Sequence, residues 1–137
     1  MEEKILFYST NLMAGRVGFD EALLKGLAPD KGLYLPDRIP AIPSGKITAF
    51  RDMPYHEIAF EVSRQYLQGV ITEGELRKIC LDAYDYEVPL EHVHDRKYVM
   101  RLDRGPTASF KDFAARMMGR LMQYYLRQDN RKMLILT

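Results

Sequence analysis

The protein has 137 residues, of which 47% are hydrophobic and 28% are charged. This composition is typical of a globular protein and excludes a disordered or collagen-like chain. The 20 Lys and Arg residues nearly balance the 19 Asp and Glu residues, so the net charge of +1 gives no long-range attraction to nucleic acid or to an anionic membrane.

The cysteine content and the length of the apolar runs exclude further classes of protein. Cys80 is the only cysteine, which excludes an internal disulfide framework and a zinc cluster of cysteines. No apolar run approaches the roughly 18–20 residues of a membrane helix, and the N-terminus does not resemble a signal peptide. We therefore expect a soluble cytoplasmic protein that binds neither nucleic acid nor membrane.

The first third of the chain is predicted to combine short strands with a helix. Aromatic and β-branched residues at 5–8 favour a strand. The apolar spacing over 19–27 predicts a helix that ends at Gly26 and Pro29. Residues 36–48 contain three prolines, and we interpret them as an extended connection over the surface.

Two helices are predicted next. One apolar face runs over residues 55–67, and the pair Thr72 and Glu75 forms a capping box that starts the second helix. Leu76, Ile79, Cys80 and Ala83 lie on the apolar face of that second helix. We therefore expect Cys80 to be an inert core thiol.

The last forty residues are predicted to form a strand–helix–strand unit. Residues 98–102 favour a strand, residues 110–127 give the strongest helical pattern, and residues 133–136 are apolar without alternation, as in a strand of a parallel sheet. The fold class is therefore α/β. Because the chain stops at the end of such a strand, where ligand-binding loops normally begin, we expect it to be a fragment of a larger enzyme.

Residues 105–113 contain the strongest candidate for chemistry. Ser109 is the predicted N-cap of the last helix, Asp112 occupies the third helical position, and Lys111 lies in the first turn. The helix dipole disfavours a cation there, and burial by Phe110 and Phe113 would favour the neutral amine that imine formation with an aldehyde needs. The residues alone leave open a surface lysine whose ammonium group reaches water.

The same segment, GPTASFKDFAAR at residues 105–116, closely resembles the lysine motif of the threonine synthase family, G-P-T-x-x-F-K-D-F-[GA]-x-R. Residues 8–11 resemble the opening of that family, residues 19–36 resemble its F-x-E-A-[VL]-x-x-G-L-A-P-D-G-G-L-[YF]-x-P block, and residues 133–137 resemble the strand that enters its S-G-D-T-G loop. Five positions depart from the family's usual residues: Lys31 replaces a glycine, Asp103-Arg104 replaces an aromatic–His pair, and Ala108-Ser109 replaces Leu-Ala.

The resemblance implies a small N-terminal α/β domain over residues 1–95, followed over 96–137 by the truncated start of a fold-type-II domain that binds pyridoxal phosphate. The intact enzyme would be a carbon–oxygen lyase that converts O-phosphohomoserine and water to threonine and phosphate. Lys111 would be the catalytic residue and would hold the cofactor as an internal aldimine. Ser109 and Thr107 would contact the cofactor or the substrate.

Two further residues of the motif are expected to be structural. Asp112 is interpreted as a first-turn acid, and Arg116, one helical turn later, is expected to pair with it. The residues that hold the cofactor's phosphate and pyridine ring would lie beyond Thr137. We therefore expect the 137-residue chain alone to be inactive.

Three other functions stay open. A related phospholyase would eliminate phosphate from the substrate without adding water. Another enzyme that uses the same lysine–aldehyde chemistry would carry out a deamination. A noncatalytic fragment would act as an interaction module that self-associates through an exposed sheet edge.

No metal site is expected, because His92 and His94 lack a third ligand at a suitable spacing. Arg104 would either recognise a phosphate or be a solvated loop residue.

Overall fold

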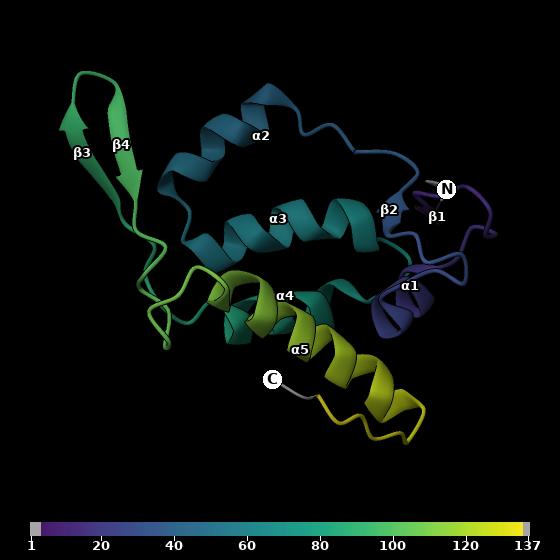
Figure 1. Ribbon diagram of the computed structural model, residues 1–137. Helices are drawn as coiled ribbons and strands as arrows, with labels where there is room; N and C mark the ends of the chain where they lie inside the picture. The colour runs from purple at the N-terminus through teal and green to yellow at the C-terminus, as the bar shows by residue number, and fades with distance from the viewer. Residues whose placement is uncertain (1–3, 136–137) are drawn as a thin grey trace.

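A computed structural model describes residues 4–135 and consists of packed helices with a small antiparallel sheet at each end (Figure 1). This mixture of helices and strands confirms the predicted α/β class. In chain order the elements are β1 (Phe7–Ser9), α1 (Phe19–Lys25), β2 (Tyr34–Pro36), α2 (Ser44–Ala49), a 3-10 turn η1 (Phe50–Asp52), α3 (Tyr55–Leu67), α4 (Glu73–Ala83), β3 (Leu90–His94), β4 (Lys97–Met100) and α5 (Asp112–Gln128).

The core lies between α3, α4 and α5, and α1 packs against α5. Each helix contributes apolar residues that recur every three or four positions, so that they fall on one face. The buried members are Phe60, Leu67, Ile71, Leu76, Ile79, Cys80 and Leu121. The prediction that Cys80 lies in the core is confirmed. Burial raises the pKa of its thiol to about 11, which keeps the sulfur protonated near neutral pH.

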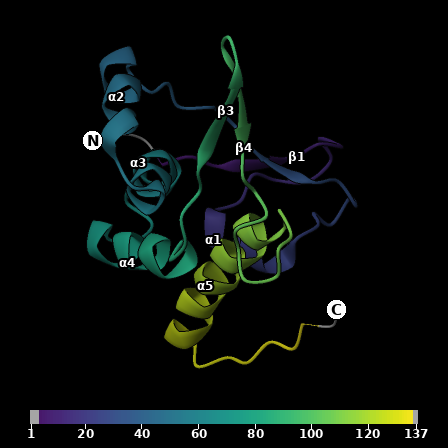
Figure 2. The same ribbon diagram turned by 90° about the vertical axis from the view of Figure 1, so that its left-hand side faces the viewer.

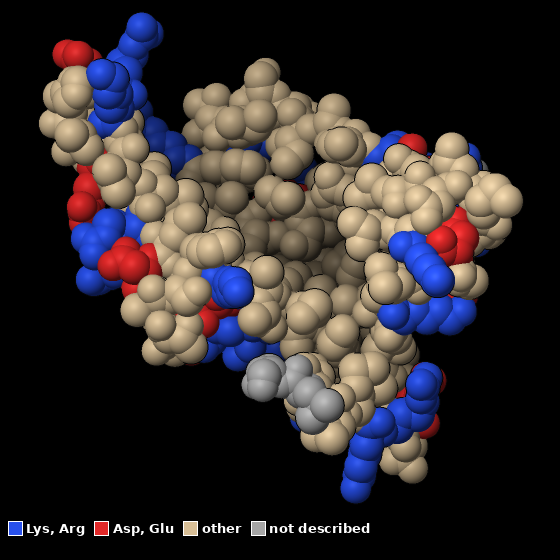
Figure 3. Space-filling view, viewed as in Figure 1, with Lys and Arg blue, Asp and Glu red and all other residues tan. Residues whose placement is uncertain are grey.

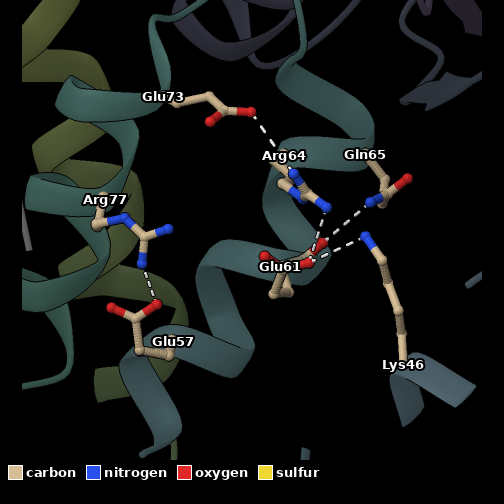
Figure 4. A network of polar contacts seen from close by, with 7 residues as sticks. All are labelled: Lys46, Glu57, Glu61, Arg64, Gln65, Glu73 and Arg77. Carbon is tan, nitrogen blue, oxygen red and sulfur yellow. Dashed lines mark hydrogen bonds and ion pairs between the residues drawn. The ribbon is translucent and has the colours of Figure 1, made fainter. Parts of the chain in front are cut away.

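The bounds of α3 and α4 agree with the helices predicted from the sequence. The N–H of Glu75 donates to the Thr72 Oγ1 atom at 3.4 Å, which confirms Thr72 as the N-cap of α4. A network of charged side chains joins α2, α3 and α4 beside this core (Figure 4). In it Arg77 pairs with Glu57, and its guanidinium lies 4.0 Å from the centre of the Phe60 ring. The charged network therefore covers the apolar core on this side.

The N-terminal part is held together by the carboxylate of Asp30. It accepts hydrogen bonds from the Ser9 hydroxyl (2.6 Å), the Gly32 N–H (3.0 Å) and the Met13 N–H (3.0 Å). A Cβ atom on Gly32 would lie 2.1 Å from the Ser9 Oγ atom, so only glycine fits there. We call these residues, Ser9, Met13, Asp30 and Gly32, the Asp30 cluster. It fastens the end of β1 to the turn that precedes β2.

The sequence predicted an extended connection over residues 36–48, but the structure differs at its end. Residues 44–49 form the helix α2. Pro43 has φ −57° at the N-cap, and its carbonyl accepts hydrogen bonds from the N–H groups of Lys46 and Ile47. Pro43 therefore stands at the start of a helix, whereas the sequence analysis interpreted the prolines of this segment as signs of an extended connection. The ammonium group of Lys46 then pairs with Glu61 of α3 at 3.5 Å.

The strands near α5 also differ from the prediction. β4 pairs with β3 in an antiparallel hairpin that projects from the helices, whereas we expected it to start a parallel strand–helix–strand unit (Figures 1 and 2). Local pairing across a two-residue turn satisfies both strands at little loop-closure cost. Residues 131–135 are in no strand, and no strand of the described residues pairs with them. The rest of the predicted 133–136 strand lies outside the described residues.

Every residue of the two hairpin strands is exposed. The expected domain boundary between residues 95 and 96 falls in the turn of this hairpin. Self-association through a sheet edge remains a prediction. On the face shown in Figure 3 the middle of the protein is hollowed and carries few charged side chains, whereas the rim carries many. Within residues 4–135, no helix is long and apolar enough to cross a membrane.

Candidate active-site lysine loop

Residues 105–111, which we call the lysine loop, connect the hairpin to α5 and contain two consecutive tight turns. The N–H of Ala108 donates to the Gly105 carbonyl at 3.0 Å, and the N–H of Asp112 donates to the Ser109 carbonyl at 3.0 Å. Ala108 takes a positive φ of 55°, which is unusual for a residue with a side chain. The loop is therefore a compact structure, although only its last residues approach helical geometry.

The helix begins two residues later than the sequence predicted. Its first residue is Asp112 and its N-cap position is Lys111, so the prediction that Ser109 is the N-cap is wrong. The Ser109 hydroxyl oxygen instead accepts the N–H of Lys111 at 3.3 Å and closes the turn before the helix. The Lys111 carbonyl accepts the N–H of Ala115 at 2.9 Å, the first bond of α5.

Asp112 is buried, with 6% of its surface exposed, and it binds the loop that precedes it. Its Oδ2 atom accepts the N–H of Thr107 at 2.9 Å, and its Oδ1 atom accepts the Thr107 hydroxyl at 2.7 Å. Gly105 packs directly on this carboxyl group: a Cβ atom there would lie 2.4 Å from Oδ2. The first-turn position expected of Asp112 is confirmed, and its partner is Thr107.

Arg116 does not pair with Asp112, which corrects the prediction from their spacing. Its guanidinium donates to the carbonyls of Ala83 (2.7 Å) and Asp82 (3.0 Å) and to the Asp85 carboxylate (2.6 Å). The last carbonyls of a helix lack partners within the helix, and a guanidinium has several donors to offer them. Arg116 therefore ties α5 to the C-terminal end of α4.

An aromatic cluster fixes the same end of α5. The ring of Phe113 lies 5.4 Å from that of Tyr55, 6.1 Å from that of Tyr84 and 5.6 Å from that of Tyr86, measured between centroids. The Tyr84 hydroxyl also donates to the Phe113 carbonyl at 2.9 Å, and burial raises the pKa of Tyr84. The sequence did not predict this cluster, although Tyr84 and Tyr86 directly follow the end of α4.

Lys111 itself is exposed, and its surroundings differ from those predicted. Phe110 is 65% exposed, and Phe113 packs into the aromatic cluster. Of the two readings that the residues left open, the structure therefore supports the exposed lysine and not burial by these two rings. The lysine loop offers an accessible primary amine two residues after the Ser109 hydroxyl, and an accessible amine is the group that an aldehyde cofactor requires.

The two histidines of the hairpin contact Asp95. His92 Nε2 lies 2.8 Å from the Asp95 carbonyl oxygen, and His94 Nδ1 lies 3.2 Å from an Asp95 carboxylate oxygen. Across residues 4–135 no group of three or more His, Cys, Asp or Glu side chains could hold a metal ion.

Comparison with solved structures shows that this fold is similar to part of the threonine synthases. The protein matches the structure of pyridoxal-phosphate-bound threonine synthase from Brucella melitensis with a TM-score of 0.87 and 34% identity, over 93% of this chain and 28% of that one. It matches threonine synthase from yeast with a TM-score of 0.79 and 26% identity, over 91% of this chain and 27% of that one.

Sequence comparison then identifies the family. Residues 6–84 match the family model described as "Threonine synthase N terminus", and the chain belongs to this family. It is 35% identical to threonine synthase from Pseudomonas aeruginosa over 135 residues, and 37% identical to threonine synthase from Schizosaccharomyces pombe over 136 residues. These matches cover 95% of this chain but only 29% and 26% of those two proteins. The chain therefore spans less than a third of their length.

Proposed function

We propose that this chain is the N-terminal part of a threonine synthase, a pyridoxal-phosphate-dependent carbon–oxygen lyase. The whole enzyme would convert O-phosphohomoserine and water to threonine and phosphate in the cytoplasm. The observation that carries this proposal is the lysine motif at residues 105–116, which presents an accessible amine at the start of α5. Membership of the family and the names of the similar proteins support it.

Lys111 would have two tasks. Its Nζ atom would hold the cofactor covalently, and after release the same amine would move protons between carbon atoms of the substrate. Bound pyridoxal phosphate supplies the electron sink that stabilises a carbanion. The exposure of Lys111 suits both tasks because the amine must reach an aldehyde and then a substrate.

Ser109 and Thr107 would contribute differently to binding. The Thr107 hydroxyl donates its only proton to Asp112, so it can offer a ligand only its lone pairs. The Ser109 oxygen accepts the N–H of Lys111, and this bond does not use the hydroxyl proton. We therefore assign Ser109, rather than Thr107, as the donor to a cofactor or substrate oxygen.

We also propose that residues 1–137 alone do not turn over substrate. The lysine loop supplies one amine and two hydroxyl groups, whereas a phosphate is normally anchored by several backbone N–H groups or cationic side chains. The residues that complete the site would belong to the remainder of a full-length enzyme. This portion would thus contribute the attachment point without the phosphate anchor.

The cofactor assignment is tested by adding pyridoxal phosphate to the full-length protein and reducing it with borohydride. We expect visible absorbance on binding, and after reduction a mass increase on the peptide that contains Lys111. Lys111→Ala should abolish both signals, while Lys97→Ala, a matched change of an exposed lysine in β4, should leave both intact. Equal labelling of the Lys111→Ala variant would refute the role of Lys111.

Product analysis distinguishes the reactions that this lysine chemistry allows. A threonine synthase releases threonine and phosphate in equal amounts from O-phosphohomoserine. A phospholyase releases phosphate without threonine, and a deaminase releases ammonia. Phosphate release without threonine would refute the proposed reaction while leaving the assignment of Lys111 in place.

A further inference from the structure

We propose that Thr107 and Asp112 form a latch that positions Lys111 for its cofactor, a role that rests on the function proposed above. The latch consists of the two hydrogen bonds from the Thr107 N–H and hydroxyl to the Asp112 carboxylate. In this role both are positioning residues, and neither needs to touch the cofactor. The latch would set the place of the lysine backbone before any ligand binds.

The latch closes a short loop of chain around Lys111. Thr107 and Asp112 are five residues apart, and the two bonds of 2.9 and 2.7 Å join the ends of this segment. Lys111 lies inside the closed segment, immediately before Asp112. Its backbone is therefore held by the helix on one side and by the latch on the other.

The carboxylate of Asp112 is well suited to hold this segment. It is 94% buried, and both of its oxygen atoms accept a hydrogen bond from the same residue. A carboxylate acceptor makes such bonds stronger than bonds between neutral groups. Its place at the first position of α5 adds a favourable interaction with the helix dipole.

Two further features of the loop lie next to this carboxylate or within the latched segment. Gly105 approaches it so closely that a Cβ atom would lie 2.4 Å from Oδ2. Ala108, inside the latched segment, holds a positive φ of 55° without being glycine. Such a strained conformation persists only where the surrounding contacts impose it. The latch is the contact that spans Ala108.

The latch is in turn fixed to the rest of the protein. Arg116 binds the last carbonyls of α4, and the Tyr84 hydroxyl binds the Phe113 carbonyl. Both contacts lie within the first turns of α5. A continuous series of contacts therefore connects the helical core to the segment that contains Lys111. The helix α4 binds α5, and Asp112 at the start of α5 binds Thr107.

The experiment compares three variants of the full-length protein. Thr107→Val removes the hydroxyl bond and keeps the shape of the side chain, whereas Thr107→Ser keeps both bonds and should behave as wild type. Thr72→Val is the matched control, because it removes a hydroxyl that closes the start of α4, at the end of that helix away from the lysine loop (Figure 1).

Two measurements separate positioning from simple stability. The first is the dissociation constant of pyridoxal phosphate, together with the pH midpoint of its absorbance when bound. We expect Thr107→Val to weaken binding about tenfold, the low end for a hydrogen bond to a charged group, and to shift the midpoint by about half a unit. Thr72→Val should lower thermal stability and change neither quantity.

The second measurement needs no cofactor. In the cofactor-free wild-type protein, amide hydrogen exchange at Thr107 should be slow, because its N–H is bonded to Asp112. Asp112→Asn should accelerate that exchange about tenfold. Fast exchange at Thr107 in the wild type would overturn the proposal even if every variant failed to fold.

The outcomes also separate this proposal from the function on which it rests. If Thr107→Val and Thr72→Val change stability alike and leave cofactor binding unchanged, the latch has no positioning role, although Lys111 still binds the cofactor. If Lys111→Ala retains the absorbance of the wild type, the proposed function itself is wrong.

Discussion

Replacing Arg116 tests how the lysine helix is held to the rest of the protein. Arg116→Ala removes the hydrogen bonds to the carbonyls of Ala83 and Asp82 and the ion pair with Asp85. The Arg116 side chain is only 19% exposed, so water replaces these partners poorly. The change leaves two helix-terminal carbonyls without their charged donor.

The magnitude follows from the exposure of each partner. Asp85 is 64% exposed, and an ion pair of this kind contributes about 0.5 kcal/mol. A hydrogen bond from a charged donor contributes about 1.5–3 kcal/mol, and the two carbonyl bonds share one guanidinium. We therefore expect Arg116→Ala to lower the free energy of unfolding by about 3 kcal/mol. Asp85→Ala should lower it by about 0.5 kcal/mol.

Urea unfolding followed by circular dichroism measures both changes in the purified protein. The double variant should lose no more than Arg116→Ala alone, because removing the guanidinium already removes the ion pair. Arg116→Lys should recover only part of the loss, since an ammonium group lacks the planar fork of donors. Equal losses for Arg116→Ala and Asp85→Ala would refute the claim that the helix carbonyls are the main partners.

Two further predictions concern the turn before β2. Lys31 has a φ of 67°, so Lys31→Gly should raise the free energy of unfolding by about 0.5–1 kcal/mol, whereas Lys31→Ala should give no gain in the same urea assay. The hydrogen bond from Ser9 is the main cause that lowers the pKa of Asp30 from 3.8, so the folded state favours its charged form. This stabilisation is complete above the unfolded pKa near 4 and is lost as the pH falls through the lower folded value. Unfolding measured between pH 2 and 6 should therefore show a smaller acid-induced loss for Asp30→Asn, and an equal loss would contradict the role of Asp30.

The helices at the centre of the protein were predictable because their signals are local. The period of apolar residues and the hydroxyl of Thr72 specify α3 and α4 within short stretches of sequence. The segment of the lysine motif was also recognisable, because the order of its residues is distinctive. The apolar period of a helix and the N-cap bond at Thr72 were therefore predictable from the sequence alone.

Partners distant in sequence were not predictable in the same way. Arg116 was expected to pair with Asp112, four residues earlier, but its partners lie 31 to 34 residues away. The spacing rule describes an isolated helix, whereas here the end of α4 offers better acceptors. The sequence could not decide between a buried and an exposed Lys111 for a related reason, since the packing of Phe113 involves three tyrosines on other segments.

The hairpin shows a third limit of sequence patterns. Apolar residues in β4 indicated a strand, yet nothing in that pattern specified which strand would be its neighbour. The segment that became β3 was not recognised because it contains two histidines and a glutamate among its five residues. In the structure β4 pairs with β3, the strand nearest to it along the chain, which costs little loop-closure entropy.

The Asp30 cluster restricts how this part of the protein can change during evolution. A Cβ atom on Gly32 would meet the Ser9 hydroxyl and also the backbone nitrogen of Asn11, so a smaller residue at position 9 does not by itself make room for a side chain at position 32. Position 32 should therefore stay glycine whatever residue stands at position 9. Saturation mutagenesis of position 32 should yield no folded variant, in the wild type and in a Ser9→Ala background alike.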